Sequence, residues 1–161
     1  MIPILLVNGL LITLVIIIHD EFLFRLTRLM PYLNIRRRSR LMLGVFGGLA
    51  AHAVEVWVFA FAYYIMHAEK NWGHLEGNYD GTLLGSFYYS LTTFTTLGFG
   101  DIVPHGDMRY TTGMESLTGL VLITWTASFL FIEMQKYWAI DEVNRDEVKQ
   151  IDAKNSDSEK D

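Results

Sequence analysis

Three long apolar segments constrain the fold of this chain more than any other feature of its sequence. They cover residues 1–18, 41–66 and 111–134, and none of them holds more than two charged residues. Each segment reaches the roughly 17–25 residues that a bilayer-spanning helix needs. The first segment lacks the basic start and the small-residue cleavage site of a signal peptide, so we expect it to be retained. The sequence therefore predicts an all-α membrane protein with three transmembrane helices.

The distribution of basic residues predicts how these helices cross the membrane. Six arginines lie between the first two apolar segments, whereas residues 67–82 hold a single lysine. Positive charge marks the cytoplasmic side of a membrane protein. We therefore expect an N-terminal transmembrane helix over residues 1–19 that starts outside, a basic cytoplasmic linker over residues 20–40, and a cytoplasmic C-terminus. The membrane would be a plasma membrane or a bacterial inner membrane.

The linker itself has two parts. Residues 20–30 keep helical spacing and are expected to lie along the inner interface of the membrane. The cluster from Arg36 to Arg40 follows as a basic turn. Such a cluster usually anchors a helix end at the headgroups, and it is also a candidate site for an anionic lipid.

A short segment between the second and third apolar segments has a different character. "TLLGSFYYSLTTF" has 13 residues, too few to span a bilayer, and this length fits a re-entrant half-helix. It is followed by "TTLGFGD", residues 95–101. Backbone outside a helix is tolerated at membrane depth only inside protein or along a water-filled path. We therefore expect this stretch to line such a path.

The alternation of Leu97, Gly98, Phe99 and Gly100 suits a path for cations. Glycine adopts left-handed backbone conformations at little cost, so the run can turn successive carbonyl groups to one side. Rings of carbonyl oxygens from several chains can replace the water shell of a cation, and Thr96 can add a ring of hydroxyls. The C-terminal end of the half-helix carries partial negative charge, which favours a cation there.

At this point the sequence resembles a known family. "TTLGFGD" resembles the selectivity signature of potassium channels, Thr-Thr-x-Gly-Tyr/Phe-Gly-Asp, and residues 41–138 resemble the order of elements in their pore domain. The resemblance implies a homotetramer that conducts potassium ions passively, with no cofactor, no enzymatic activity and no nucleic-acid partner. It implies an outer helix over 41–66, a pore helix over 83–95, a filter over 96–101, an inner helix over 111–136, and then an acidic cytoplasmic tail over 139–161. We expect the end of this tail to fray.

The resemblance also implies roles for single residues around the filter. Potassium ions would bind at Thr96, Leu97, Gly98 and Phe99, and Gly100 would complete the lining. Filter support would come from Tyr88, Tyr89, Thr92, Thr95 and Asp101. In that set, Asp101 would brace the outer end and the two tyrosines would form an aromatic cuff. Thr92 stands where some members of the family have a carboxylate.

Further roles are implied for the inner helix. Gly119 occupies the usual hinge position, although close helix packing explains a glycine there equally well. Ile123, Ala127 and Phe131 follow at intervals of four residues and are candidate cavity-lining side chains. Phe131 is a candidate hydrophobic gate. Glu115 either braces the region behind the filter or forms a hydrogen bond near the outer interface.

His52 and Glu55 are ionisable residues within the second apolar segment. They are three residues apart and so share one face of a helix. A mutually satisfied pair that packs against a neighbouring helix is the favoured interpretation, and a proton sensor is the alternative, because histidine titrates near neutral pH. A zinc-protease site is excluded, because "HAVE" lacks the second histidine of that motif.

A channel of the same fold and two other classes of protein are the alternatives to a potassium channel. A weakly selective cation channel of the same fold is disfavoured, because the sequence from Gly98 to Asp101 is intact. A potassium-transporter subunit would repeat a degenerate filter four times in one long chain. A membrane enzyme would need a polar catalytic cluster, for which only His52 and Glu55 are candidates. A voltage sensor of the known kind is not expected, because no apolar segment has arginine at every third position.

Overall fold

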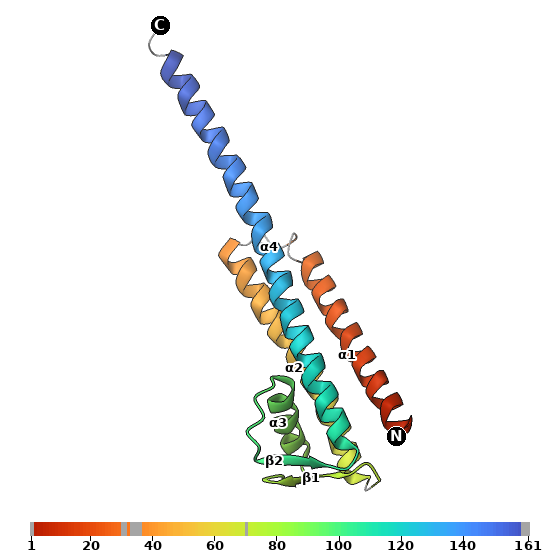
Figure 1. The fold of residues 1–161 in the computed structure, drawn as a ribbon. Helices are drawn as coiled ribbons and strands as arrows, with labels where there is room; N and C mark the ends of the chain where they lie inside the picture. Colours follow the sequence, from red (N-terminus) through yellow and green to blue (C-terminus); the bar gives the residue numbers. More distant parts are fainter. Residues whose placement is uncertain (1, 30–31, 33–36, 70, 159–161) are drawn as a thin grey trace.

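The fold is a bundle of three long helices with a short helix and a two-stranded hairpin at one end (Figure 1). The computed structural model describes the backbone of residues 2–29, 32, 37–69 and 71–158, and the side chains of the same residues except 37, 38 and 136–158. The helices are α1 (Ile2–Leu29), α2 (Arg37–Ala68), α3 (Leu83–Phe94) and α4 (Met108–Ser158). The strands are β1 (His74–Gly77) and β2 (Ile102–His105).

Three of these helices are long and apolar enough to cross a membrane, as the sequence predicted. The spans are Ile2–Leu29, Ser39–Ala68 and Met108–Gln135. Within the most apolar stretch of each span, only 28–33% of the residues are buried inside the chain. Most of the surface of these helices is therefore left for lipid or for other protein chains.

The first helix is longer than the predicted helix over residues 1–19. Its buried residues recur every three or four positions along its whole length: Ile4, Asn8, Leu11, Val15, His19, Leu23 and Leu26. One continuous stripe of buried side chains therefore packs against the bundle, and this packing keeps α1 helical beyond His19. The segment from residue 20 to 29, expected to lie along the membrane interface, is instead the last part of α1.

Helix α4 also exceeds its predicted length. It begins at Met108 rather than at residue 111, and it continues through the acidic segment to Ser158, which lies within the end that was expected to fray. Residues 139–158 contain neither glycine nor proline, so no helix-breaking residue ends α4 before this point. Residues 159–161 lie outside the described part of the chain.

The hairpin was not predicted, because both of its strands lie in segments expected to be loops. Strand β1 pairs antiparallel with β2, and His74 lies opposite His105. Gly77 has a φ of 102°, and a Cβ at this position would overlap the carbonyl oxygen of Asp101. Only glycine permits this close approach. The hairpin therefore ties the outer loop to the end of the predicted filter.

The start of α3 is fixed by side chains that bond to its backbone. The hydroxyl of Thr82 accepts a hydrogen bond from the amide of Gly85 at 3.0 Å, as an N-cap residue does. The Asp80 carboxylate accepts bonds from the amide and the hydroxyl of Thr82, at 3.0 and 2.7 Å. These bonds lower the pKa of Asp80. The half-helix therefore begins at a defined point beside the hairpin.

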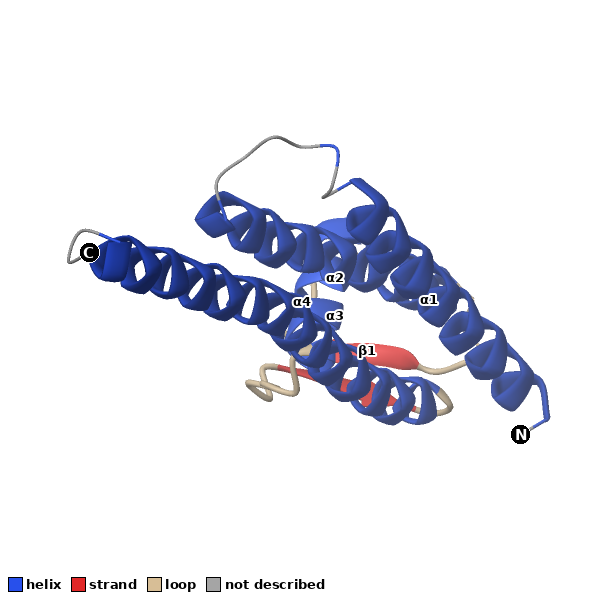
Figure 2. Cartoon of the chain, turned by 90° about the horizontal axis from the view of Figure 1, so that it is seen from above, coloured by secondary structure: helices blue, strands red, loops and turns tan. Residues whose placement is uncertain are grey.

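The helices are arranged so that α2 packs against each of α1, α3 and α4. The N-terminus of α1 lies at the end of the bundle that holds α3 and the hairpin, and the C-terminus of α4 lies at the opposite end (Figure 1). Figure 2 shows the two strands side by side at the edge of the helical bundle. The three long helices therefore alternate in direction, as the predicted topology requires.

Candidate ion-conduction site

The backbone of the predicted filter alternates in handedness. Thr96, Gly98 and Gly100 have φ angles of 58°, 47° and 77°, in the left-handed region. Among the described residues, Thr96 is the one non-glycine residue with a positive φ. Such a conformation is uncommon for a residue with a side chain and often marks a functional segment. An alternating backbone of this kind is what turns successive carbonyl groups to one side.

The last turn of α3 holds the first part of the filter in place. The carbonyl oxygen of Thr92 accepts hydrogen bonds from two filter amides, Leu97 at 2.9 Å and Gly98 at 3.1 Å. The amide of Thr96 donates to the carbonyl oxygen of Thr93 at 2.9 Å. Thr92 therefore contacts the filter through its backbone, and its hydroxyl donates to the carbonyl oxygen of Tyr89 within α3.

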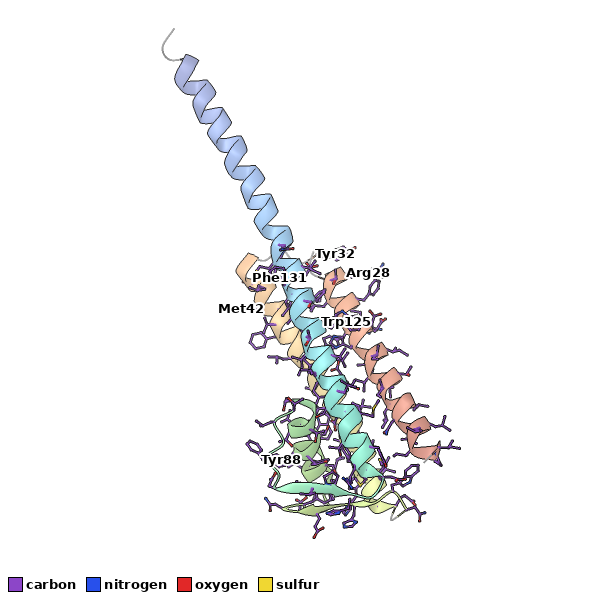
Figure 3. The ribbon with its side chains drawn as sticks, viewed as in Figure 1. Arg28, Tyr32, Met42, Tyr88, Trp125 and Phe131 are labelled. Carbon is purple, nitrogen blue, oxygen red and sulfur yellow. The ribbon has the colours of Figure 1, made fainter. Side chains whose placement is uncertain are left out.

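The other end of the filter is held by Asp101. Its carboxylate accepts a hydrogen bond from the hydroxyl of Tyr88 at 2.9 Å, and its carbonyl oxygen accepts one from the amide of Asn78 at 2.8 Å. Figure 3 labels Tyr88 on the outer side of α3. Thr95, at the end of α3, donates its hydroxyl to the carbonyl oxygen of Leu91 at 2.7 Å. Both ends of the predicted filter are therefore held by hydrogen bonds to other elements of the same chain.

A buried carboxyl group lies behind α3. The Glu115 side chain is fully buried and accepts hydrogen bonds from Tyr63 at 2.6 Å and from Ser90 at 2.5 Å. Tyr89 packs edge-on against Tyr63, and its hydroxyl lies 2.7 Å from that of Thr112. This network joins α2, α3 and α4. Of the two predicted cuff tyrosines, Tyr89 therefore points into its own chain, whereas Tyr88 is 37% exposed.

Sequence reasoning left the role of Glu115 open and missed its partners Tyr63 and Ser90. These residues come from helices that are distant in sequence. The one signal in the sequence that pointed to such contacts was the number of hydroxyl groups in α3. The isolated carboxylate of α4 could accept hydrogen bonds from them.

The inner-helix candidates lie in two different environments. A Cβ at Gly119 would overlap the carbonyl oxygen of Phe94 and would lie 3.0 Å from its Cγ. This close approach of α4 to the end of α3 gives a direct reason for a glycine, while the hinge stays a prediction. Ile123, Ala127 and Phe131 are all exposed on α4 and are not covered by their own chain.

His52 and Glu55 belong to a larger cluster than the sequence suggested. His52 Nδ1 lies 2.8 Å from Glu55 Oε2, and His19 Nδ1 of α1 lies 2.7 Å from Glu55 Oε1. His19 and Glu55 are fully buried. Sequence reasoning missed His19, although it lies on the buried stripe of α1. The pair is therefore satisfied by hydrogen bonds, and a second histidine shares the carboxylate.

A comparison with known families bears on this geometry. A family model described as "Ion channel" matches residues 51–136, which is more than half of the chain. The matched region contains α3, the filter segment and the hairpin, together with most of the membrane spans of α2 and α4. No curated protein matches the chain.

Proposed function

Because the chain belongs to the ion-channel family whose model it matches, we propose that it is a potassium-selective channel that works as a homotetramer. The observation that carries the proposal is the alternating backbone at Thr96, Gly98 and Gly100, placed directly after the re-entrant helix α3. The channel conducts passively along the potassium gradient, uses no cofactor and catalyses no reaction. Its permeant ligand is K⁺.

The selectivity mechanism follows from the carbonyl groups of the filter. Potassium ions would be held at Thr96, Leu97, Gly98 and Phe99, where carbonyl oxygens replace the water shell of the ion. The C-terminal end of α3, at Phe94, directs its partial negative charge toward the same region and favours a cation there. An ion can then move from one site of the filter to the next without a conformational change of the filter.

The tetramer is supported by apolar surface that one chain leaves uncovered. Leu97 and Phe99 are 58% and 65% exposed, although they lie within the filter. On α4, Leu117, Leu120, Val121 and Phe131 are each more than half exposed. A filter from one chain cannot surround an ion, whereas four chains around one axis would do so and would cover these side chains.

The orientation is part of the proposal. The N-terminus and the hairpin would face the outside, and the linker and the end of α4 would face the cytoplasm of a plasma or bacterial inner membrane. The proposed anionic-lipid site at Arg36 to Arg40 lies mostly outside the residues whose side chains are described.

The proposal is tested by ion flux from liposomes that contain the purified protein. Potassium efflux and sodium efflux are measured separately, for the parent and for two variants. Gly98→Ala places a Cβ on a left-handed residue, which costs about 1–2 kcal/mol in each chain, so selective potassium efflux should be lost. Gly9→Ala is the matched control, because no atom lies within 4 Å of a Cβ built there.

Equal sodium and potassium efflux in the parent would favour the weakly selective cation channel instead. Unchanged selective efflux in Gly98→Ala would remove this residue from the filter.

A further inference from the structure

Four polar side chains from three helices meet inside the apolar part of the bundle. They are His19 of α1, His52 and Glu55 of α2, and Thr126 of α4, and we call them the three-helix cluster. His19 and Glu55 are fully buried, and the side chain of His52 is 15% exposed. Buried ionisable groups in membrane proteins are costly and are usually paired with one another.

The carboxylate determines where the ring protons lie. An ionised carboxylate can only accept hydrogen bonds. The two Nδ1 atoms lie 2.7 and 2.8 Å from separate oxygens of Glu55, so each Nδ1 donates a proton to its oxygen. The other nitrogen of each ring, Nε2, then either accepts a hydrogen bond in a neutral ring or donates one in a charged ring.

Thr126 faces both of these Nε2 atoms. Its hydroxyl oxygen lies 3.1 Å from Nε2 of His52 and 3.4 Å from Nε2 of His19. Other hydroxyls on α4 instead donate to the carbonyl four residues earlier, namely those of Thr112, Thr118, Thr124 and Ser128. The Thr126 hydroxyl has one proton and two nitrogen neighbours.

A count of donors and acceptors therefore selects one protonation state. If both rings are neutral, one hydroxyl proton faces two acceptors, and the buried cluster has a charge of minus one. If one ring carries an extra proton, its Nε2 donates to the Thr126 oxygen, and the Thr126 proton goes to the other ring. Every polar atom is then paired and the cluster is neutral. The count is the same if the extra proton lies on the carboxyl group.

A bound metal ion fits the distances less well. The two imidazole nitrogens and the carboxylate lie within 4.8 Å of one another, as ligands of one ion would. However, zinc bonds of about 2.0–2.1 Å in tetrahedral geometry would hold a nitrogen and an oxygen roughly 3.3 Å apart. The observed separations of 2.7 and 2.8 Å are those of hydrogen bonds.

The surroundings leave the cluster to balance its own charge. Two aromatic side chains contact its rings: Phe94 of α3 against His52 and Trp125 of α4 against His19, with centroid distances of 5.7 and 5.2 Å. Neither can titrate. On α1, Asp20 and Glu21 are exposed, and Glu21 pairs with Arg25. Among the residues whose side chains the structure describes, the titratable partners of Glu55 are the two histidines.

Two adjacent glycines bring the helices together beside the cluster. A Cβ at Gly48 would lie 2.6 Å from Cγ2 of Thr126, and a Cβ at Gly47 would lie 2.8 Å from Cδ2 of Leu26. Helix α2 therefore contacts α4 at one glycine and α1 at the next. Thr126 therefore contacts both the cluster and Gly48, so a movement of Thr126 changes the contact between α2 and α4.

We propose that the three-helix cluster binds one exchangeable proton, and that loss or gain of this proton shifts α4 relative to α1 and α2 and so controls channel opening. Proton binding is independent of the proposed function, and only the effect on opening rests on it. The cluster with one extra proton is the form in which every polar atom has a hydrogen-bond partner. The inner helix carries both Thr126 and the predicted cavity face, so a shift at Thr126 reaches the pore directly.

Proton binding is tested by nuclear magnetic resonance of protein with ¹⁵N-labelled histidine rings, in lipid nanodiscs between pH 5 and 8.5. His19→Gln and His52→Gln assign the two ring signals. We expect each ring to carry a proton on Nδ1 and the two rings to share one extra proton on Nε2. In Glu55→Gln, the rings should no longer bind this extra proton. Two neutral rings that both carry their proton on Nδ1 over the whole range would overturn the proposal, because a protonated carboxyl group would require one ring to carry its proton on Nε2. A stoichiometric shift of both signals by added Zn²⁺, reversed by a chelator, would overturn it in favour of a metal site.

The effect on opening is tested by single-channel recording over the same pH range. The parent's open probability should change as the cluster titrates, and Thr126→Val should lose this dependence. Thr126→Ser keeps the hydroxyl and should retain it, as should Thr124→Val, the matched control on the same helix. A pH response that is the same in Thr126→Val and in the parent would overturn the coupling. A chain that binds the proton but carries no current would instead count against the proposed function.

Discussion

At the scale of single residues, buried polar side chains hold the elements around the filter in place. Glu115 is fully buried and takes hydrogen bonds from Tyr63 and Ser90. A buried polar group left without a partner costs about 1–3 kcal/mol, so each member of this set restricts the others. The resemblance to potassium channels implies that Thr92 stands where some members of that family have a carboxylate. In this chain, Glu115 of α4 supplies a buried carboxyl group that contacts α3 through Ser90.

The first prediction concerns this network. Tyr63→Phe should lower the free energy of unfolding by about 1–3 kcal/mol, because it leaves an oxygen of Glu115 without a donor. Thermal unfolding of the purified protein measures the effect. Tyr64→Phe is the matched control and should change little, because Tyr64 is 42% exposed. Equal effects of the two substitutions would show that the bond to Glu115 contributes nothing.

Part of this detail could be predicted from the sequence. His52 and Glu55 were recognised as neighbours because they lie three positions apart on one helix. The resemblance implied that Asp101 is a brace, and the structure gives its partners as Tyr88 and Asn78. His19 and Ser90 could not be found in this way. Their partners lie 36 and 25 positions away in the chain, and no local pattern links such residues.

At the scale of helices and strands, the apolar segments determined most of what could be predicted. Length and composition gave three spans and a half-helix, whose observed bounds are Leu83–Phe94. The continuation of α1 to Leu29 depended on a buried stripe that crosses the polar residues after His19. The hairpin was not predicted, because strands of four residues give little sequence pattern. The pairing also depends on glycines that permit close contact between the two backbones.

The second prediction concerns the contact between α3 and α4. Gly119→Ala should destabilise the protein by about 1–3 kcal/mol, as overpacking does, because the added methyl group would overlap the Phe94 carbonyl oxygen. It should also reduce potassium flux, because Phe94 directly precedes the filter segment. Gly113→Ala is the control on the same helix, with open space at the added atom. If Gly113→Ala and Gly119→Ala have the same thermal stability, the close contact is not a constraint.

At the scale of the whole molecule, one chain leaves much of its apolar surface uncovered. Most of each span is exposed, and no part of the described chain buries the side chains of Leu97 and Phe99 in the predicted filter. The proposed tetramer supplies that cover and places four filters around one axis. The alternating direction of the three long helices puts the two chain termini at opposite ends of the bundle (Figure 1).

The third prediction concerns orientation in the membrane. The chain has no cysteine, so single cysteines can be introduced without background reaction. Tyr32→Cys lies in the basic linker at an 86% exposed position, and Asn78→Cys lies in the exposed turn after β1. In intact cells, a membrane-impermeant thiol reagent should label position 78 and leave position 32 unlabelled. Labelling of both positions, or of position 32 alone, would contradict the predicted orientation.

The central claim is that the backbone from Thr96 to Gly100 selects potassium, and the reversal potential tests it most directly. Current through the purified protein is recorded in a planar bilayer with potassium on one side and sodium on the other. A carbonyl-lined filter predicts a reversal potential far from zero, with the sign expected for permeant potassium. A reversal potential at zero would mean that the two ions pass equally well, and it would contradict the account.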